Sequence, residues 1–480
     1  MIDTKALRKK ILELAFNGKL SSSNSTDNSS EELVKSIYQQ KEILVREKKI
    51  SKIKQMNAIK EDEMIFDIPS GWGYYKLGEL CLPLSDGVHY APEYQDNGYK
   101  CFSAKDIYNN RINDNDCTYI TEEEYIGMKN KINVQEGSIL VTKSGSIGRS
   151  AVVDKYFEFG LVESIGVINP IFVDSEYIKY VLDYGFVYSS YYYEKYTRGV
   201  GLKHLTLTLL ENIPIPLPPL TEQKNLVKTI KNAFELMDKI DTLQQQYEAD
   251  ISVLKSKIID AGIRGKLMEQ LPEDGDAETL YSQIQEEKAK LIKDGKIKKE
   301  KTLPEIDDNE IPFDIPKNWK WVYMGEIFEH NTGKALNNAD RDGVQLEYIT
   351  TSNMYWDHFE LDSLKSMYFR ESEIEKCTIT KGDLLICEGG DIGRSAIWTF
   401  DYDMRIQNHI HKLRGYGGIE HKFYFYIMRN YKDSGMIDGR GIGLQGFSSK
   451  RVHSLIVPLP PIDEQKRIVK TIDELLQIIG

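Results

Sequence analysis

The chain has 480 residues, of which 41% are hydrophobic, and this length and composition suit two globular domains with connecting helices. Its 62 basic and 74 acidic residues give a formal net charge of −12, which argues against a simple, strongly basic nucleic-acid-binding protein. No apolar run approaches the ~20 residues of a membrane span, and no signal-peptide pattern opens the chain. The five cysteines form no Cys-x-x-Cys pair. We therefore expect a cytoplasmic protein with reduced thiols.

An internal repeat with a period near 245 residues runs through the sequence. Three motifs occur twice: Phe-Asp-Ile-Pro at 66–69 and 313–316, Gly-x-Ile-Gly-Arg-Ser-Ala at 145–151 and 390–396, and Pro-Leu-Pro-Pro-x-x-Glu-Gln-Lys at 216–224 and 458–466. From Pro216 to Ile230, eleven of fifteen positions are identical in the second copy. A period this long indicates a duplicated domain pair rather than a solenoid or propeller repeat.

The repeat is circular. Residues Leu7 to Leu20 match Leu254 to Leu267 at an offset of 247, so the end of one repeat stands at the start of the chain. The second repeat stops at Gly480, where the first copy continues to Tyr247. This arrangement makes physical sense if the N-terminal helix packs beside, or continues, the C-terminal helix, and it predicts two halves related by a pseudo-two-fold axis.

Seven segments follow one another along the chain. An N-terminal helix over 1–20 is followed by a loop and a lysine-rich helix over 21–64, a first globular domain over 65–219, a central helix over 220–267, a second loop and lysine-rich helix over 268–311, a second globular domain over 312–461 and a distal helix over 462–480. The lysine-rich helices suit contact with phosphates, but a solvated helix face is the commoner meaning of such a pattern.

Both globular domains are predicted to be mixed α/β. Short buried strands are expected at 138–142 and 383–387, and each leads through a glycine-rich turn into a second strand, at 150–153 or 395–399. Glu176 to Tyr193 is predicted to be one tyrosine-rich helix. Residues 108–135 and 152–198 match the second copy least well, so the frame is expected to repeat while the interior of each domain differs.

Heptad spacing dominates the central helix. From Leu226 to Ala261, apolar or aromatic residues recur at alternating intervals of four and three, with Gln244 as the exception, and this predicts a coiled coil of ~50 Å. The alternative is a pair of amphipathic helices, each buried against its own domain. The predicted seam consists of Leu226, Ile230, Met237, Ile240, Ile251, Leu254, Ile258, Ile468, Ile472 and Leu475, together with Leu7, Ile11 and Leu14 of the N-terminal helix.

The Pro-Leu-Pro-Pro-x-x-Glu-Gln motif, twice opening a long helix that ends in Gly-Lys-Leu, closely resembles the specificity subunits of type I restriction-modification systems. The Ile-Pro-x-x-Trp segments at 68–72 and 315–319 and the Gly-x-Ile-Gly-Arg loops fit the same pattern. The resemblance covers essentially the whole chain, except that the distal helix stops at Gly480, short of the central one. It implies two α/β target recognition domains joined by long antiparallel coiled-coil helices.

The resemblance also implies a function and partners. Each recognition domain would read one half of an asymmetric, bipartite double-stranded DNA target, the helices would set the spacer, and two methyltransferase subunits would dock on the assembly, with restriction subunits in the full complex. S-adenosylmethionine, ATP and Mg are expected only in those partners, so this chain is expected to be a non-catalytic subunit without a cofactor or metal.

The residues themselves agree that no catalytic site is present. The string nearest to the Asn/Asp-Pro-Pro-Tyr/Phe motif of adenine methyltransferases is Asn169-Pro170-Ile171, which fails the pattern. His409 and His411 suit metal ligation from one strand face, but the first copy has no matching partner.

Polar residues of two glycine-rich loops in each domain are the predicted DNA contacts. Glycine lets backbone N–H groups approach phosphates closely, and arginine to guanine and glutamine to adenine are favoured major-groove pairs. Arg149 and Arg394 are shared by both copies, and internal bracing is an equal alternative for them. The predicted set is Lys143, Ser144, Ser146, Arg149, Arg198 and Lys203 in the first copy, and Arg394, Arg440 and Gln445, beside Glu388, in the second.

The acidic balance leaves a rival function open. Residues 65–211 carry 13 basic and 20 acidic side chains, although phosphate neutralisation normally dominates DNA affinity. Partner subunits would then have to supply the electrostatic attraction. The alternatives are a duplicated coiled-coil scaffold that binds proteins and, by family analogy alone, a methylation-only system.

Overall fold

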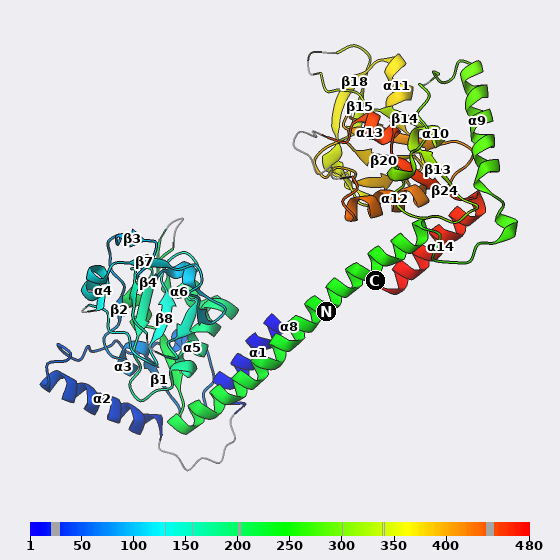
Figure 1. Cartoon of the computed structure of the whole chain (residues 1–480). Helices are drawn as coiled ribbons and strands as arrows, with labels where there is room; N and C mark the ends of the chain where they lie inside the picture. Colours follow the sequence, from blue (N-terminus) through cyan, green and yellow to red (C-terminus); the bar gives the residue numbers. More distant parts are fainter. Residues whose placement is uncertain are drawn as a thin grey trace. The chain divides into compact units, whose positions relative to one another are not determined.

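The computed structural model describes residues 1–20, 29–129, 131–155, 157–199, 203–299, 301–337, 339, 341–437 and 446–480. They form two compact units, Met1–Gln245 (unit 1) and Gln246–Gly480 (unit 2), each of which contains one copy of the repeat (Figure 1). The boundary lies within the 44-residue helix α8 (Leu220–Ile263), which contributes its first part to unit 1 and its last part to unit 2.

Unit 1 is mixed α/β, as predicted. Its helices before α8 are α1 (Thr4–Phe16), α2 (Ser30–Arg46), α3 (Leu77–Leu80), α4 (Glu122–Lys129), α5 (Ser175–Asp183), α6 (Tyr191–Tyr196) and α7 (Leu207–Glu211). Its strands are β1 (Gly73–Lys76), β2 (Ser85–Asp86), β3 (Tyr94–Gln95), β4 (Tyr99–Phe102), β5 (Ile107–Tyr108), β6 (Arg111–Ile112), β7 (Thr118–Ile120), β8 (Ile139–Thr142), β9 (Ser150–Val152), β10 (Phe159–Leu161), β11 (Ile165–Ile168) and β12 (Pro214–Leu217).

Unit 2 repeats this composition. Its helices are the end of α8, α9 (Ala277–Lys293), α10 (Met324–Ile327), α11 (Glu371–Cys377), α12 (His421–Asp433), α13 (Ser449–His453) and α14 (Ile462–Ile478). Its strands are β13 (Lys320–Tyr323), β14 (Phe328–Thr332), β15 (Val344–Ile349), β16 (Met354–Tyr355), β17 (His358–Phe359), β18 (Lys365–Phe369), β19 (Thr378–Ile379), β20 (Leu384–Cys387), β21 (Ser395–Ile397), β22 (Met404–Ile406), β23 (Ile410–Gly415) and β24 (Ile456–Leu459).

One sheet has the same strand order in both units. The orders β2-β11-β8-β9 and β14-β23-β20-β21 correspond strand for strand, and all their pairings are antiparallel. The central strands β8 and β20 are buried along their whole length, because each carries an apolar run between two neighbouring strands. The predicted buried strands and the glycine-rich turns after them are therefore confirmed.

The second sheet differs at one edge. In both units a parallel pair, β4 with β10 or β15 with β22, is flanked by an antiparallel strand, β7 or β18. In unit 1 the fourth strand, β3, pairs with β7, whereas in unit 2 the fourth strand, β19, pairs with β22. Such an edge is the place where an extra strand is added most easily, because its backbone N–H and C=O groups are unpaired.

In each unit, the Pro-Leu-Pro-Pro-x-x-Glu-Gln motif connects the last strand, β12 or β24, to the helix that follows it, α8 or α14. Gln223 is fully buried; its side-chain amide donates to the Pro218 carbonyl (2.8 Å) and accepts from the backbone N–H of Asp174 (2.9 Å). Gln465 makes the same two bonds, to Pro460 (2.8 Å) and from Glu420 (2.9 Å). Asp174 and Glu420 are the N-caps of α5 and α12, so one glutamine fixes the start of two helices.

The Gly-Lys-Leu motif is a helix C-terminus that packs on the Phe-Asp-Ile-Pro motif. Gly18 and Gly265 adopt left-handed backbone angles (φ +68° and +64°) directly after α1 and α8. A Cβ at Gly18 would lie 2.0 Å from Pro69 Cγ, and a Cβ at Gly265 would lie 2.4 Å from Pro316 Cγ. Only glycine fits both the angle and the contact, which explains why these motifs recur together.

The lysine-rich helices are held to their own domains. Lys41 of α2 is buried and donates to the Gly78 carbonyl (2.9 Å), and Lys288 of α9 donates to the Gly325 carbonyl (2.8 Å). Burial lowers the pKa of the Lys41 ammonium. The interpretation of both lysines as part of a solvated or phosphate-tracking face is wrong, because their charged ends are used inside the domain. The first of these helices, α2, ends at Arg46, well before the end of the predicted segment 21–64.

Helices α1 and α14 lie along different parts of α8 (Figure 1). In unit 1, Arg8 pairs with Asp238 (2.7 Å) and Asp241 (2.9 Å), and the Ile2 N–H donates to Gln244 (2.6 Å). In unit 2, Ile259 and Ile263 of α8 share an apolar cluster with Ile468, Val469 and Ile472 of α14.

The predicted continuous seam is only partly buried. Leu226, Ile230, Met237, Ile468 and Ile472 are buried, whereas Leu7 (42% exposed), Tyr247 (62%) and Leu254 (42%) are exposed. On α1, Leu12, Ala15 and Phe16 are the buried apolar residues, and Phe16 contacts Phe66, Tyr177 and Tyr184 of the domain. The heptad assignment of Leu7 was therefore wrong, because the domain competes with α8 for the apolar face of α1.

The predicted helix from Glu176 to Tyr193 is divided into three parts. After α5 the chain forms a π-helical turn over Tyr184–Tyr188, and Ser190 adopts a left-handed conformation (φ 60°) before α6. Tyr177 and Tyr192 are fully buried, and their hydroxyls donate to the carbonyls of Pro216 (2.6 Å) and Pro214 (2.9 Å) on β12. Packing of the tyrosines onto β12 accounts for the interruption.

Candidate nucleic-acid interface

In each unit, the first residue after the central strand is held by two backbone hydrogen bonds. This residue is Lys143 after β8 and Glu388 after β20. The Lys143 N–H donates to the Ser164 carbonyl (2.8 Å), and its carbonyl accepts from Leu205 N–H (2.9 Å). The Glu388 N–H donates to the His409 carbonyl (2.9 Å), and its carbonyl accepts from Phe447 N–H (2.7 Å). Lys143 and Glu388 therefore occupy equivalent backbone positions. Each is bonded on one side to the residue before the neighbouring strand, β11 or β23, and on the other side to a residue that follows the second glycine-rich loop.

In unit 1, Lys143 is not a free cation. Its ammonium is paired with the carboxylate of Asp86 on β2, and its side chain is only 10% exposed. The imidazole of His89 lies on the other side of Asp86, with Nε2 at 3.2 Å from a carboxylate oxygen, and its Nδ1 lies 3.5 Å from Glu163. Sequence reasoning missed Asp86 and His89, because β2 has only two residues and no motif marks it.

In unit 2, the equivalent position carries the opposite charge. The Glu388 carboxylate lies 3.2 Å from His409 Nδ1, and both side chains are partly exposed, at 29% and 55%. The fully buried His411 instead contacts the Phe447 carbonyl (2.7 Å) and His330 (3.0 Å). Burial, and then the neighbouring His411, lowers the pKa of His330 to about 3.

The histidines of unit 2 do not form a metal centre. His409 and His411 have different partners, and no group of three His, Cys, Asp or Glu side chains within the described ranges is arranged to hold an ion.

The shared arginines of the two glycine-rich turns have different environments. Arg149 is exposed, and its guanidinium makes no hydrogen bond or ion pair with any residue that the structure describes. Arg394 is partly buried, donates to the Thr351 carbonyl (2.6 Å) and lies 5.5 Å from the centre of the Tyr355 ring. The geometry therefore favours bracing for Arg394 and leaves Arg149 available for a ligand.

The other predicted contacts fall into two groups: Ser144 and Ser146 are accessible, whereas the side chains of Arg198 and Lys203 contact their own domain. Ser146 is exposed and Ser144 partly exposed on the first turn. Arg198 and His204 exchange two backbone hydrogen bonds (3.0 and 2.8 Å) that close the second loop, the Arg198 guanidinium donates to the Lys195 and Thr197 carbonyls (both 3.1 Å), and Lys203 lies 4.6 Å from the Tyr193 ring centre. Arg440 and Gln445 lie outside the described residues.

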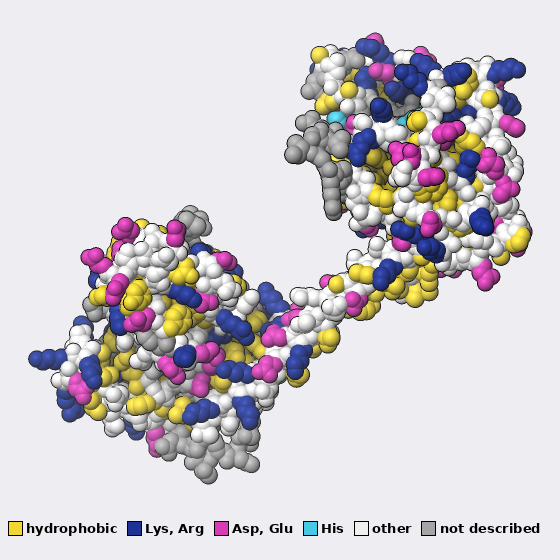
Figure 2. All heavy atoms as spheres, viewed as in Figure 1, with side chains coloured by type: hydrophobic (Ala, Val, Ile, Leu, Met, Phe, Trp, Pro, Cys, Tyr) yellow, Lys and Arg dark blue, Asp and Glu magenta, His cyan; other side chains and the backbone are white. Residues whose placement is uncertain are grey.

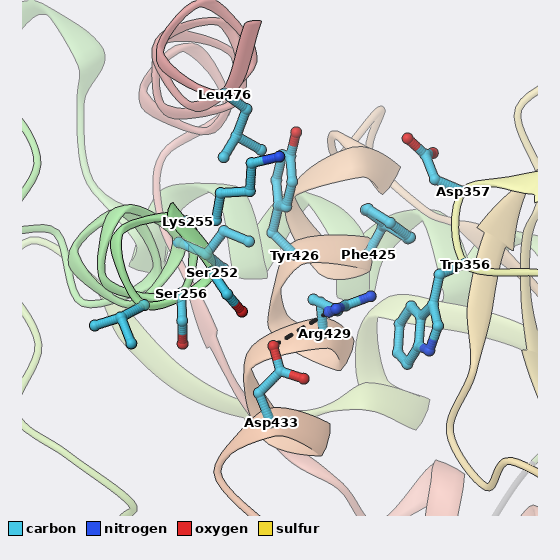
Figure 3. A pocket seen from close by; sticks show the side chains of 12 residues that line it. Ser252, Lys255, Ser256, Trp356, Asp357, Phe425, Tyr426, Arg429, Asp433 and Leu476 are labelled. Carbon is cyan, nitrogen blue, oxygen red and sulfur yellow. Dashed lines mark hydrogen bonds and ion pairs between the residues drawn. The ribbon is translucent and has the colours of Figure 1, made fainter. Parts of the chain in front are cut away.

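A crevice between the recognition domain and the helices occurs in both units. In unit 2 it encloses about 450 Å³ and is lined by Trp356 on the β16-β17 turn, Phe425 and Arg429 on α12, Ser252 on α8 and Leu476 on α14 (Figure 3). Figure 3 shows Arg429 between Asp433 and Trp356; it pairs with Asp433 (3.1 Å) and lies 4.9 Å from the Trp356 ring centre.

The same place in unit 1 has different chemistry. Its crevice of about 570 Å³ is lined by Lys5 and Arg8 of α1, by Asn109 to Arg111 of the β5-β6 turn, and by Asp238. Behind that turn, the buried Lys179 donates to Asn110 (3.1 Å) and pairs with Asp183 (2.7 Å). Lys179 lies five residues after the N-cap of α5, and Phe425 lies five residues after the N-cap of α12, so the two positions are equivalent. The Lys179–Asp183 ion pair of unit 1 is therefore replaced by an aromatic ring in unit 2.

Three further features describe the chain as a whole. Basic and acidic side chains are interspersed on the visible faces of both units in Figure 2, in keeping with the negative net charge. Within the described ranges, no helix is both long and apolar enough to span a lipid bilayer. The five cysteines are all buried and free.

These features define a class: a two-domain recognition protein with a repeated frame, variable turns and long connecting helices. The model of the type I restriction modification DNA specificity domain matches residues 69–249 and 316–480. The chain therefore belongs to the type I restriction-modification DNA specificity family. Because members of this family are specificity subunits, its role is recognition of DNA sequence and not catalysis, as the sequence predicted.

Named relatives and solved structures agree. The chain is 27% identical to the type I restriction enzyme EcoAI specificity subunit of Escherichia coli, over 98% of this chain and 89% of that protein, and 25% identical to the EcoEI specificity subunit of Escherichia coli, over 99% and 89%. Its fold is similar to the HsdS subunit from Thermoanaerobacter tengcongensis (TM-score 0.51, 17% identity, 87% and 92% covered). It is also similar to a chain from a study of complex assembly and conformational transition of the type I R-M system (TM-score 0.59, 17% identity, 86% and 91% covered).

Proposed function

We propose that the chain is the specificity subunit of a type I restriction-modification complex in which each unit reads one half of an asymmetric, bipartite double-stranded DNA target. The observation that carries this proposal is a sheet of identical strand order in both units, from which turns of different chemistry project. A conserved frame with different turns suits two domains that hold DNA in the same way and read different sequences.

The turn residues of unit 1 support phosphate contact. Ser146 and Arg149 are exposed, and Gly145 adopts a left-handed angle (φ 67°) with open space around its Cα. Such a turn presents backbone N–H groups and an exposed guanidinium together, and these groups commonly position a protein on a phosphate backbone. We therefore assign Ser144, Ser146, Arg149, Arg198 and Lys203 to the DNA-facing edge of unit 1. From the sequence repeat alone, we propose Arg440 and Gln445 as further DNA contacts.

Helix α8 supports a proposal for the partners. Leu236 (60% exposed), Leu243 (68%), Tyr247 (62%) and Val253 (53%) are large apolar side chains exposed along one helix. Leu236, Leu243 and Tyr247 follow one another at intervals of seven and four residues, so they share one face of the helix. A contiguous apolar face of this kind commonly marks a protein-binding surface. We propose that the two methyltransferase subunits dock along α8, α1 and α14, that restriction subunits join them in the full complex, and that S-adenosylmethionine, ATP and Mg are bound by these partners.

The helices are also proposed to set the spacer between the half-sites. The contacts of α1 and α14 with α8 support pairing as antiparallel coiled-coil segments, with a pseudo-two-fold relation between the repeats. The free cysteines fit assembly in the reducing cytoplasm.

The test is co-expression of the chain with its methyltransferase subunits in a host that lacks other DNA methylation, followed by methylome sequencing. We expect one bipartite motif with two different halves and a non-specific spacer. A contiguous motif would contradict the proposal. Complexes that assemble without any motif-specific methylation would favour the rival function, a scaffold that binds only proteins.

A further inference from the structure

A short β-hairpin lies beside the glycine-rich turn in both repeats. In unit 1 the strands β5 and β6 pair Tyr108 with Arg111, and in unit 2 the strands β16 and β17 pair Tyr355 with His358. Both hairpins turn in two residues, and both pack against the strand that follows the glycine-rich turn, β9 or β21. Tyr108 and Arg111 are therefore the counterparts of Tyr355 and His358.

In unit 2 the side chains of this hairpin are engaged with one another and with the turn. The Tyr355 ring stacks on the His358 ring, with the ring centroids 4.9 Å apart and an interplanar angle of 11°. The Arg394 guanidinium lies 5.5 Å from the centre of the Tyr355 ring. The arginine of the glycine-rich turn and the last pair of the hairpin are thus immediate neighbours in the shared frame.

The three counterparts in unit 1 are open to solvent. Tyr108 is 38% exposed, and Arg111 and Arg149 are also exposed. Within the described part of the chain, none of these three side chains makes a hydrogen bond, an ion pair or a ring contact. Unit 1 therefore presents two uncompensated guanidinium groups where unit 2 has a histidine and an arginine that both contact one tyrosine.

The hairpin forms one wall of the unit 1 crevice, and helix α1 contributes Lys5 and Arg8 to the other. Arg8 is balanced by Asp238 (2.7 Å) and Asp241 (2.9 Å). Lys5 is exposed, and no residue that the structure describes pairs with its ammonium. Lys5 and Arg111 are thus two unpaired cations that line one crevice from different elements.

The same positions of unit 2 lack these cations. At the positions of the two unpaired cations, unit 2 has Ser252 and His358. The cations that line its crevice are engaged: Lys255 donates to the Gly480 carbonyl (2.7 Å), and Arg429 pairs with the carboxylate four residues later on α12 (3.1 Å). Among its described lining residues, the unit 2 crevice therefore has no unpaired lysine or arginine.

The lining of the unit 1 crevice suits a phosphate. Beside the cations it contains the amide side chains of Asn109 and Asn110, and side-chain amides donate to phosphate oxygens. Asn110 accepts from Lys179 through Oδ1 (3.1 Å), which leaves its amino group to donate. Apart from Val187 and Tyr188, the lining side chains are charged or amides, so an apolar protein segment would find little to bury there.

We propose that Lys5 and Arg111, together with Arg149 of the glycine-rich turn, bind phosphates of the DNA backbone beside the first half-site, and that unit 2 has no equivalent site. Such contacts add affinity and fix the position of the domain on the duplex without reading bases. The net negative charge of the chain is compatible with this site, because its unpaired cations are gathered at one edge. This inference rests on the proposed function, because it requires that unit 1 hold duplex DNA.

The experiment measures DNA binding by the complete complex with its methyltransferase subunits at several salt concentrations. Each phosphate contact contributes about 0.9 to the slope of log affinity against log salt, so Lys5→Ala, Arg111→Ala should reduce that slope by about two. Between about 50 and about 200 mM salt, the variant should then lose about tenfold less affinity than the wild type. The methylome motif should not change.

Three further variants separate charge from folding. Lys5→Arg, Arg111→Lys keeps both charges and should keep the wild-type slope. Lys5→Gln, Arg111→Gln keeps much of the length of both side chains and should lose the same slope as the alanine variant, so the result does not depend on how the alanine variant folds. Ser252→Ala, His358→Ala changes the matched positions of unit 2 and, at pH 8, should leave the slope unchanged.

Neutral methylphosphonate linkages in the DNA locate the contacts. One or two such linkages beside the first half-site should weaken binding of the wild-type complex and have no effect on the double alanine variant. Linkages beside the second half-site should affect both complexes equally. Equal effects at every linkage would contradict a phosphate site formed by Lys5 and Arg111.

An unchanged salt slope in the alanine and glutamine variants would overturn the inference. Loss of a methyltransferase subunit from these purified variants would overturn it too, because the crevice would then bind an acidic segment of that protein. The proposed function fails separately: a wild-type complex without a bipartite motif would contradict it, whereas a bipartite motif with an unchanged slope would leave it standing.

Discussion

The two units share the sheet β2-β11-β8-β9 or β14-β23-β20-β21, and they differ in three places around it: the fourth strand of the second sheet, the residue that follows the central strand, and the crevice against the helices. All three lie at edges or turns, where a substitution leaves the buried strands untouched. The comparison teaches that duplication has preserved the parts that fix backbone geometry, while side chains and strands that face outward have changed.

The preserved parts form one connected set in each unit. The buried glutamine after the proline-rich strand, the glycine at the end of the helix and the proline that it touches all control how the domain joins its helices. None of them faces the candidate DNA-binding edge. Their repetition therefore reflects a shared joint, and it carries no information about which bases are read.

The largest effect is expected from abolishing the difference between the units. Replacing residues 312–457 by residues 65–215 should convert the asymmetric motif into an interrupted palindrome, because both units would then read the same half-site. Methylome sequencing of the co-expressed complex checks this result. A motif that keeps its original second half would show that the half-sites are read outside the transplanted domains.

A four-residue insertion near Gln244 tests whether the helices set the spacing while the units read independently. It adds about one helical turn, ~5.4 Å, which corresponds to between one and two base pairs at 3.4 Å each. The expected motif has both half-sites unchanged and a spacer longer by one or two nucleotides. If a half-site changed while the spacer stayed the same, the helices would be recognition elements.

Equivalent apolar residues should stabilise their own units. Ile230 and Ile472 occupy the same repeat position and are fully buried, so replacing either with alanine should lower the free energy of unfolding of its unit by about 2–5 kcal/mol. Denaturant titration with a fluorescent probe in each unit measures this. The exposed Leu254 is the matched control, and Leu254→Ala should change stability by less than about 0.5 kcal/mol.

The smallest effect separates the two arginines of the repeated glycine-rich turn. Arg394→Ala should cost about 1–3 kcal/mol of stability, because a partly buried charge-assisted hydrogen bond to Thr351 is lost. Arg149→Ala should leave stability unchanged but weaken DNA binding by the complex and reduce the slope of log affinity against log salt by about one. Equal effects on stability would show that Arg149 also braces its turn.

Much of the fold followed from local patterns. Proline-rich and glycine-rich motifs mark fixed backbone geometries, and apolar runs between turns mark buried strands, so the central strands and the long helix were predictable. The interruption after α5 was not, because the helix pattern continues through Tyr184–Tyr188 and only the packing of tyrosines on β12 breaks it.

The candidate site was less predictable than the fold. The glycine-rich turns identified Lys143, Arg149, Glu388 and Arg394, but the sequence assigned no partner to any of them. Asp86 and His89 escaped notice because their significance comes from a two-residue strand that pairs with β11, 80 positions later in the chain at Gly166.

The sequence alone therefore determined the circular duplication, the mixed α/β class and the family resemblance, since repeated motifs and periodic apolar residues are properties of neighbouring positions. Only the tertiary structure decided which face of α1 is buried, that Lys41 and Lys288 are internal anchors, and that Lys143 pairs with Asp86 whereas Glu388 lies against His409. These outcomes depend on contacts between residues far apart in the chain, and the energy of burying or pairing a charge is set by those contacts rather than by its neighbours in sequence.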